Sequence, residues 1–192
     1  DLSPARMREE LDESRKRLST DYFDLYQVHW PDPQTPIAQT AAVMEQFVRK
    51  GVIRAVGVSN YSVAQMREFM KHAPLHCLQP EYSMYKRDIE SDVIPFCRSH
   101  GIAVIAYAPL YSGLLTGKFF IGDVPVPQDT NRRMKQREFQ EPYFTINKET
   151  LLRLQEIARH YQKTLTQLVI AWNFHQPGVV STIVGMRNKE QA

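Results

Sequence analysis

Helical and strand-like hydrophobic patterns alternate along most of the chain. In residues 3–18, Met7, Leu11 and Leu18 recur at helical spacing behind a Ser3-Pro4 start, which suits a helix N-terminus. Short apolar runs, closed by proline, glycine or polar residues, predict strands. The pattern predicts helices over 3–18, from Thr35-Pro36 to Gly51, over 62–71 and 92–99, and from Asn147 and Thr164 onwards, and strands at 24–29, 53–58, 76–82, 102–107 and 180–184.

Local capping signals fix several of the predicted helix starts. Ser62 with Gln65, and Thr164 with Gln167, match the capping-box pattern, in which two side chains satisfy each other's backbone donors. Asn147 is a good N-cap residue, so we expect a helix to begin there.

The order of the elements predicts an α/β fold with a parallel sheet. The first four strand starts lie roughly 23 to 29 residues apart, the spacing of βα units joined by right-handed crossovers. The run 102–107 is continuously apolar, typical of a strand buried on both faces. A closed eight-stranded barrel takes about 250 residues, and this chain has 192. We therefore expect a single domain over 1–192, an incomplete (β/α)8 TIM barrel with about five of its eight strands.

The alternation stops between Tyr111 and Ile146. This stretch contains three prolines and a basic run around Arg132 and Arg133. A solvated surface excursion is the simpler interpretation. The alternative is a lid-like insertion over 111–146, because long loops after a barrel strand commonly build the site.

Composition and charge favour an ordinary globular protein with a small-molecule partner. The chain is 43% hydrophobic and carries 24 basic and 21 acidic side chains, a formal net charge of +3. So small a net charge gives no reason to expect nucleic acid or an anionic membrane as a partner. Because no apolar run approaches the roughly 20 residues of a membrane span and the first helix is polar, we expect a cytoplasmic protein.

Cysteine and histidine spacing indicates no metal site. Cys77 and Cys97 fall on a predicted strand and a predicted helix, without the paired spacing of zinc or dithiol sites, so we expect buried thiols. The six histidines show no metal-binding motif, and we expect no metal.

Polar and aromatic residues gather at the predicted strand ends. His29 closes the run before Pro31, and the segments 57–61, 78–82 and 106–110 each end another strand. Catalytic groups of parallel barrels lie at such ends, so we expect them to share one mouth. Taken singly, His29 could be a buried histidine satisfied by backbone, and Tyr107 a core aromatic.

Several of these segments carry ordered motifs. They are DLYQVHWPDP, GVIRAVGVSNY, LQPEYSMYKR, IAYAPLYSGLLTGK and IVGMRNKEQ, between residues 24 and 191. On these motifs the chain resembles roughly the C-terminal three-fifths of an aldo-keto reductase, a nicotinamide-dependent (β/α)8 barrel. The resemblance implies an NADPH-dependent oxidoreductase that reduces aldehydes or ketones to alcohols by hydride transfer, with a small carbonyl compound as substrate.

The resemblance also implies roles for the strand-end residues. His29 matches the active-site histidine that hydrogen-bonds the substrate carbonyl, where hydride transfer builds negative charge on oxygen. Ser59, Asn60 and Gln79 match residues that hold the nicotinamide carboxamide, which both donates and accepts hydrogen bonds. Tyr107 matches the aromatic residue that stacks on the nicotinamide ring. Without the family match, Ser59 and Asn60 would be an ordinary turn and helix cap.

A second group of residues matches the family's phosphate-binding parts. Ala108, Pro109, Leu110, Ser112 and Lys118 match the pyrophosphate loop, Gly185, Arg187 and Gln191 match the adenosine-phosphate pocket, and Arg132 could reach the cofactor from the lid. The Ser112 hydroxyl and the Lys118 charge suit phosphate oxygens. Arg187 beside a helix N-terminus suits a 2′-phosphate, which favours NADPH over NADH.

The family's proton-donating tyrosine and its lysine and aspartate partners lie on earlier strands, whose motifs do not occur in this sequence. We expect this chain to be a fragment, inactive alone, with two open sheet edges that favour self-association or binding of a complementary fragment.

Two other functions stay open at this point. One is a non-catalytic nucleotide-binding regulatory subunit of the same fold. The other is a different phosphate-binding barrel, such as an isomerase or aldolase, which would leave Ser59, Asn60, Gln79 and Tyr107 unexplained.

Overall fold

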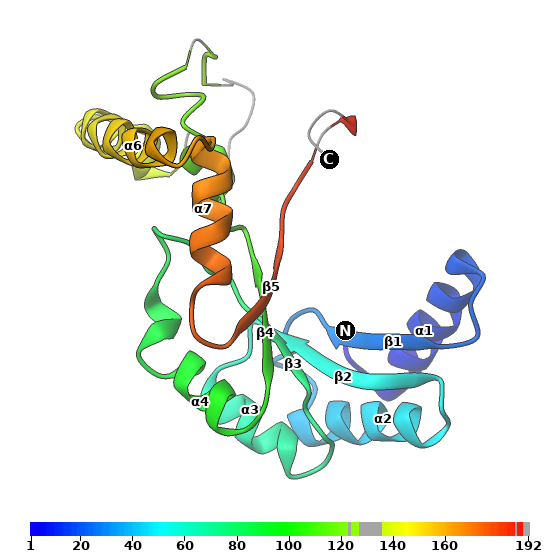
Figure 1. Ribbon diagram of the computed structural model, residues 1–192. Helices are drawn as coiled ribbons and strands as arrows, with labels where there is room; N and C mark the ends of the chain where they lie inside the picture. Colours follow the sequence, from blue (N-terminus) through cyan, green and yellow to red (C-terminus); the bar gives the residue numbers. More distant parts are fainter. Residues whose placement is uncertain (123, 127–135, 187, 190–192) are drawn as a thin grey trace. The chain divides into compact units, whose positions relative to one another are not determined.

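The computed structural model describes residues 1–122, 124–126, 136–186 and 188–189 (Figure 1). Within these residues, five strands form one open sheet in the order β1 (Phe23–Val28), β2 (Ile53–Ser59), β3 (Cys77–Gln79), β4 (Ala103–Tyr107), β5 (Val179–Ile183). The pairs β1–β2, β2–β3 and β3–β4 are parallel. The predicted α/β class is confirmed, and β1 and β5 form the two edges of the sheet.

The chain divides into two compact units, described separately below. The first comprises residues 1–80 and 88–105, and the second residues 81–87 and 106–192, so that β4 begins in one and ends in the other. The first unit holds the helices α1 (Pro4–Leu18), α2 (Ile37–Arg49), α3 (Val63–Met70) and α4 (Val93–Ser99), with a short 3-10 turn, η1 (Asp88–Glu90).

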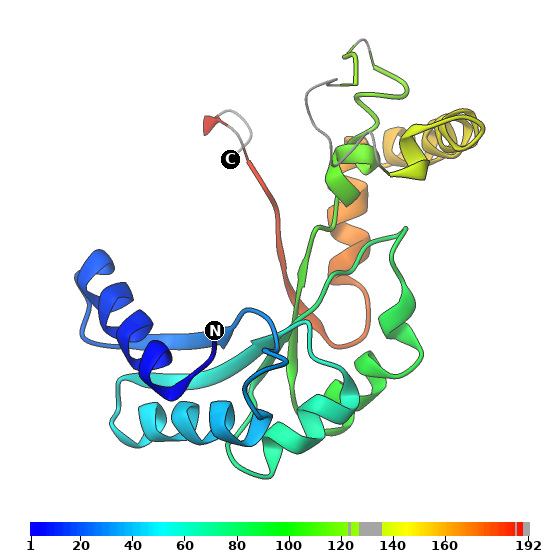
Figure 2. The same cartoon turned by 180° about the vertical axis from the view of Figure 1, so that it is seen from behind.

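The core of the first unit lies between its strands and the helices beside them. Figures 1 and 2 show α2 alongside β2, and the two elements contact each other. Met44 and Phe47 of α2 are buried, as are Ile53, Val56 and Val58 of β2. These buried apolar side chains fix β2, and with it the position of the strand end that follows.

Sequence-local signals set the helix starts in this unit as predicted. The Ser3 hydroxyl accepts a hydrogen bond from the Arg6 amide. Ser62 and Gln65 form the capping box at the start of α3, where the Ser62 amide donates to Gln65 Oε1 at 2.8 Å. The capping box holds α3 immediately after the β2 strand end, so the intervening turn has little freedom.

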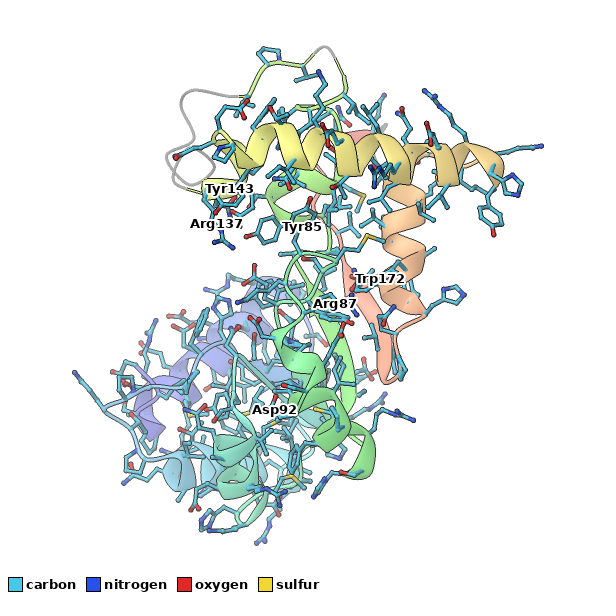
Figure 3. All side chains as sticks on the ribbon, turned by 90° about the vertical axis from the view of Figure 1, so that its left-hand side faces the viewer. Tyr85, Arg87, Asp92, Arg137, Tyr143 and Trp172 are labelled. Carbon is cyan, nitrogen blue, oxygen red and sulfur yellow. The ribbon has the colours of Figure 1, made fainter. Side chains whose placement is uncertain are left out.

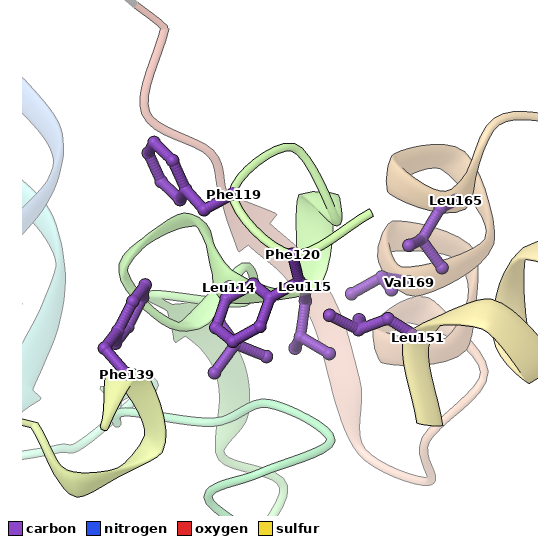
Figure 4. Packing of buried hydrophobic residues seen from close by; sticks show 8 residues of the cluster. All are labelled: Leu114, Leu115, Phe119, Phe120, Phe139, Leu151, Leu165 and Val169. Carbon is purple, nitrogen blue, oxygen red and sulfur yellow. The ribbon is translucent and has the colours of Figure 1, made fainter. Parts of the chain in front are cut away.

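The second unit is built around a hydrophobic cluster that joins two 3-10 turns and two helices. These are η2 (Tyr111–Thr116), η3 (Arg137–Phe139), α6 (Tyr143–His160) and α7 (Leu165–Phe174). Figure 4 shows the buried members of the cluster, Leu114, Leu115, Phe119, Phe120, Phe139, Leu151, Leu165 and Val169. The first residues of the predicted 111–146 excursion therefore belong to the hydrophobic core of this unit. The alternative that this segment forms a lid over the site stays a prediction.

The start of α6 differs from the sequence prediction. Asn147 is not the N-cap: the helix begins at Tyr143, after Pro142. Phe144 stacks on Phe120 with ring centroids 4.4 Å apart, so packing extends the helix by a turn. By contrast, the capping box predicted for α7 is present, with the Thr164 amide donating to Gln167 Oε1 at 2.9 Å.

Two strand predictions also need correction. β3 covers Cys77–Gln79 rather than 76–82, because Pro80 has no amide hydrogen to continue the ladder. The strand β4 is not buried on both faces: Val104 and Ala106 are buried, while its other residues are only half-buried. One face of this strand is therefore partly open to solvent.

Two further features of the described residues concern thiols and membranes. Cys77 and Cys97 are free and buried, as expected, and burial raises their pKa values to about 11 and about 12. In the described part of the chain, no helix has both the length and the apolar character to cross a bilayer. Nor does any cluster of three or more His, Cys, Asp or Glu there offer a metal site.

Candidate functional site

Three neighbouring strands of the first unit carry predicted site residues at their C-terminal ends. The register pairs Val28 with Val58 and Ser59 with Gln79. His29 follows the last residue of β1 directly, so it lies level with the end of β2. The parallel strands thus bring His29, Ser59 and Gln79 to the same C-terminal end of the sheet, as predicted.

Hydrogen bonds join these strand ends. Asn60 Nδ2 donates to the His29 carbonyl oxygen at 3.0 Å and to Ser59 Oγ at 2.9 Å. Ser59 Oγ in turn donates to the Gln79 carbonyl oxygen at 2.7 Å, and the Asn60 amide donates to the same oxygen at 3.3 Å. Asn60 therefore bridges the ends of β1 and β3 through Ser59.

Conformation and exposure differ among the four residues. Ser59 is 2% exposed, Asn60 and Gln79 are half-buried, and the His29 side chain is exposed. Asn60 adopts a left-handed backbone conformation with φ 63°, which asparagine tolerates better than most residues. Ser59 and Asn60 are thus held in place by hydrogen bonds, whereas the His29 imidazole is exposed and can bond an external partner.

The loop after His29 is anchored by Asp32. Its carboxylate accepts hydrogen bonds from the Leu2 amide, the Gln34 amide and the Thr35 hydroxyl, and these bonds lower its pKa to about 2. Burial, and then the Asp32 charge, raise the pKa of Tyr61 to about 12. Neither group changes charge near neutral pH, so both act as structural supports there.

A cavity of about 730 Å³ lies in the second unit, at the end of β4 and beside α7 and β5. It is lined by Ala108, Pro109, Leu110, Tyr111, Ser112, Gly113, Thr116, Lys118, Thr166, Ile170, Ile183, Val184, Gly185 and Met186. Six of these were predicted phosphate-binding residues: Ala108, Pro109, Leu110, Ser112, Lys118 and Gly185. Lys118 and Gly185, which are 67 positions apart in sequence, therefore line the same cavity.

The turn over this cavity has an unusual backbone. Ala108, Tyr111 and Ser112 have φ values of 54°, 44° and 55°, and Gly113 has 90°. Left-handed conformations cost non-glycine residues roughly 1–2 kcal/mol each, so such a cluster is typical of a constrained, concave backbone around a ligand. The turn is closed internally, with the Thr116 hydroxyl donating to the Gly113 carbonyl at 2.8 Å.

The remaining predicted residues are placed differently. Tyr107 is half-buried at the end of β4, where its carbonyl accepts from the Tyr82 amide at 3.1 Å, and it does not line the cavity. Arg132, Arg187 and Gln191 lie outside the described residues.

Several cavity residues were missed by sequence reasoning. Thr166 and Ile170 line it from α7, one helical turn apart, and Ile183 and Val184 line it from the end of β5. The spacing of Thr166 and Ile170 shows that they share a helix face, but not which face meets a cavity.

The cavity combines groups that suit a phosphorylated, partly apolar ligand. Ser112, Thr116 and Thr166 bring hydroxyls, Lys118 brings a cation, and the aliphatic residues offer apolar surface. Burial, followed by the nearby Glu138 carboxylate, raises the pKa of Tyr111. The Tyr111 phenol therefore stays neutral near neutral pH and does not repel an anion.

Sequence comparison gives related proteins along the whole chain. The model of the Aldo/keto reductase family matches residues 1–192. The aldo-keto reductase YhdN of Bacillus subtilis is 41% identical over 97% of this chain, and the NADH-specific methylglyoxal reductase of Escherichia coli is 36% identical over 99%. The chain spans 56% and 58% of the lengths of these relatives.

Solved structures agree. The glycerol dehydrogenase AKR11B4 from Gluconobacter oxydans matches with a TM-score of 0.94 and 36% identity, over 100% of this chain and 57% of its own. The thermostable aldo-keto reductase Tm1743, solved with the inhibitor epalrestat, matches with a TM-score of 0.74 and 30% identity, over 99% and 59%. The open sheet thus corresponds to part of an aldo-keto reductase (β/α)8 barrel, as predicted.

Proposed function

The chain belongs to the aldo/keto reductase family, and from this membership we propose that the protein containing it reduces aldehydes or ketones to alcohols with hydride from a nicotinamide dinucleotide. Family membership argues against the isomerase or aldolase alternative. The observation that supports the proposal most is the cavity in the second unit, because six residues chosen for phosphate binding from sequence alone line it.

In this proposal the cavity residues bind the phosphates of the cofactor. Ser112 and Lys118 supply a hydroxyl and a positive charge for the pyrophosphate oxygens, and the left-handed turn lets the backbone approach them closely. The aliphatic wall formed by Ile170, Ile183 and Val184 excludes water from the bound nucleotide.

The strand-end residues orient the reacting groups. Ser59, Asn60 and Gln79 bind the carboxamide of the nicotinamide, and the Tyr107 ring packs on the nicotinamide face. When bound, the reduced nicotinamide supplies the hydride. The His29 imidazole donates a hydrogen bond to the carbonyl oxygen of the substrate and stabilises the negative charge that develops there.

A proton must also reach the product oxygen, and we assign no residue of this chain to that step. The tyrosines Tyr61, Tyr85 and Tyr111 have raised pKa values caused first by burial and are occupied in packing. We therefore propose that the 192-residue chain alone does not turn over substrate.

Preference between the two nicotinamide dinucleotides is a finer proposal. Arg187, by its residue type, would pair with a 2′-phosphate and favour NADPH. One relative carries the name NADH-specific, so both dinucleotides must be tested. A lower dissociation constant for NADPH than for NADH, lost in Arg187→Ala, is the result expected.

The experiment that tests the proposed function follows oxidation of NADPH and NADH by the full-length protein with a panel of aldehydes and ketones. His29→Ala should lower kcat/KM by roughly 10²-fold, the usual effect of removing a donor to a developing oxyanion. His72→Ala removes another exposed imidazole of the same unit and should have no effect. Tight cofactor binding without turnover on any carbonyl would contradict the enzyme and favour a nucleotide-binding regulatory subunit.

A further inference from the structure

A polar cluster in the second unit supports the cavity wall from residues that do not line the cavity. The Tyr85 hydroxyl donates to Asn147 Oδ1 at 2.7 Å, and Asn147 Nδ2 donates to the Glu138 carbonyl oxygen at 2.8 Å. Asn147 is only 6% exposed, so both ends of its amide are used inside the protein. Figure 3 shows Tyr85 beside α6, the helix that carries Asn147.

The cluster reaches the cavity through ring stacking. The Tyr85 ring lies on the Tyr111 ring, with centroids 5.6 Å apart and planes 28° apart. Tyr111 lines the cavity and opens the turn with positive φ, whereas Tyr85 and Asn147 do not line the cavity. A change in Tyr85 therefore acts on a ligand in the cavity without touching it, through the stacked Tyr111 and the turn that Tyr111 opens.

The turn needs this external support. Tyr111 and Ser112 both hold left-handed conformations, which are strained for residues other than glycine and persist only where the surrounding structure holds them. The Tyr85 ring covers Tyr111, and the hydrogen bond to Asn147 fixes the plane of that ring. Asn147 is itself fixed by the Glu138 carbonyl.

We propose that Tyr85 and Asn147 are positioning residues for the phosphate-binding turn, and that they set how tightly a pyrophosphate-bearing dinucleotide is held without contacting it. This inference rests on the proposed function. Its consequence is a separation of effects: loosening the cluster weakens cofactor binding, while turnover at saturating cofactor is preserved because the strand-end residues are untouched.

The test is the dissociation constant of NADPH and of NADH for the full-length protein, measured by quenching of protein fluorescence, in wild type and Tyr85→Phe. The variant keeps the stacked ring and removes only the hydroxyl. Loss of one buried hydrogen bond predicts about three- to tenfold weaker binding, with the KM for cofactor rising in parallel and kcat changing by less than about twofold. Tyr161→Phe is the matched control, because Tyr161 is 64% exposed, and it should bind as wild type.

A second variant tests the other end of the amide. Asn147→Asp keeps an acceptor for Tyr85 but loses the donor to the Glu138 carbonyl, so it should weaken cofactor binding at least as much. Should Asn147→Asp fail to fold, Tyr85→Phe decides the question.

The possible results separate the two claims. If wild type binds a dinucleotide and Tyr85→Phe lowers the urea midpoint but leaves the dissociation constant within about twofold, the residue is only structural and this inference is overturned. Equal weakening by Tyr85→Phe and Tyr161→Phe would also overturn it. Wild-type protein that binds neither dinucleotide would overturn the proposed function as well.

Discussion

Two substitutions of Asn60 can separate the contribution of its left-handed backbone from that of its side-chain hydrogen bonds at the strand ends. The Asn60 side chain donates to the His29 carbonyl and to Ser59 Oγ, and its backbone has φ 63°. Asn60→Gly removes both donated bonds but keeps the left-handed backbone free of strain, while Asn60→Ala removes the bonds and adds the strain.

The magnitudes follow from these two contributions. Each lost hydrogen bond contributes about 1 kcal/mol, and glycine adds about 0.5–1 kcal/mol of unfolded-state entropy, so Asn60→Gly should lower the free energy of unfolding by about 2.5–3 kcal/mol. In Asn60→Ala the two lost hydrogen bonds and the left-handed strain of roughly 1–2 kcal/mol should together lower the free energy of unfolding by about 3–4 kcal/mol. If Asn60 also binds the carboxamide of the nicotinamide, both variants should weaken cofactor binding about tenfold.

Urea unfolding and cofactor titration of the full-length protein measure the two effects separately. Gln162, which has φ 55° at the exposed end of α6, is the matched control. Gln162→Gly should be no less stable than Gln162→Ala, and neither should alter cofactor affinity. The reasoning is refuted if Asn60→Gly binds cofactor as tightly as wild type, or if Asn60→Ala is more stable than Asn60→Gly.

Two further predictions concern the supports of the sites. Gly117→Ala would put a methyl group 2.9 Å from Ile121 Cδ1 at φ 76°, so it should lower the free energy of unfolding by about 2 kcal/mol or more; an unchanged urea midpoint would be inconsistent with the packing. The Asp32 pKa is lowered from 3.8 to about 2, so its contribution to stability is present above about pH 4 and is lost as the pH falls through about 2. Asp32→Asn should therefore be less stable than wild type at neutral pH, and the difference should shrink between pH 4 and 2; a difference independent of pH would contradict this.

The parts of the fold that depend on near neighbours in sequence could be predicted. The capping boxes at Ser62 and Thr164 need only a partner three residues away, and both are present. The position of His29 after β1 follows from an apolar run closed by proline. The family motifs similarly marked six residues that line the cavity.

The parts that depend on distant partners could not be predicted. Asn147 looks like a helix cap in sequence, but its side chain instead accepts a hydrogen bond from Tyr85, 62 residues away. The helix α6 begins a turn earlier because Phe144 stacks on Phe120. Thr166 lines the cavity because of the face that α7 presents, which is decided by the packing of the second unit. Nothing local to these residues carries that information.

The most direct test of the account uses NADPH or NADH labelled with deuterium at the transferable position of the reduced ring, mixed with the full-length protein and an aldehyde that it turns over. The account predicts that deuterium appears on the carbinol carbon of the alcohol, and that His29→Ala slows its appearance. Cofactor that binds while no label reaches the product, with any carbonyl compound, would contradict hydride transfer as the function of this protein.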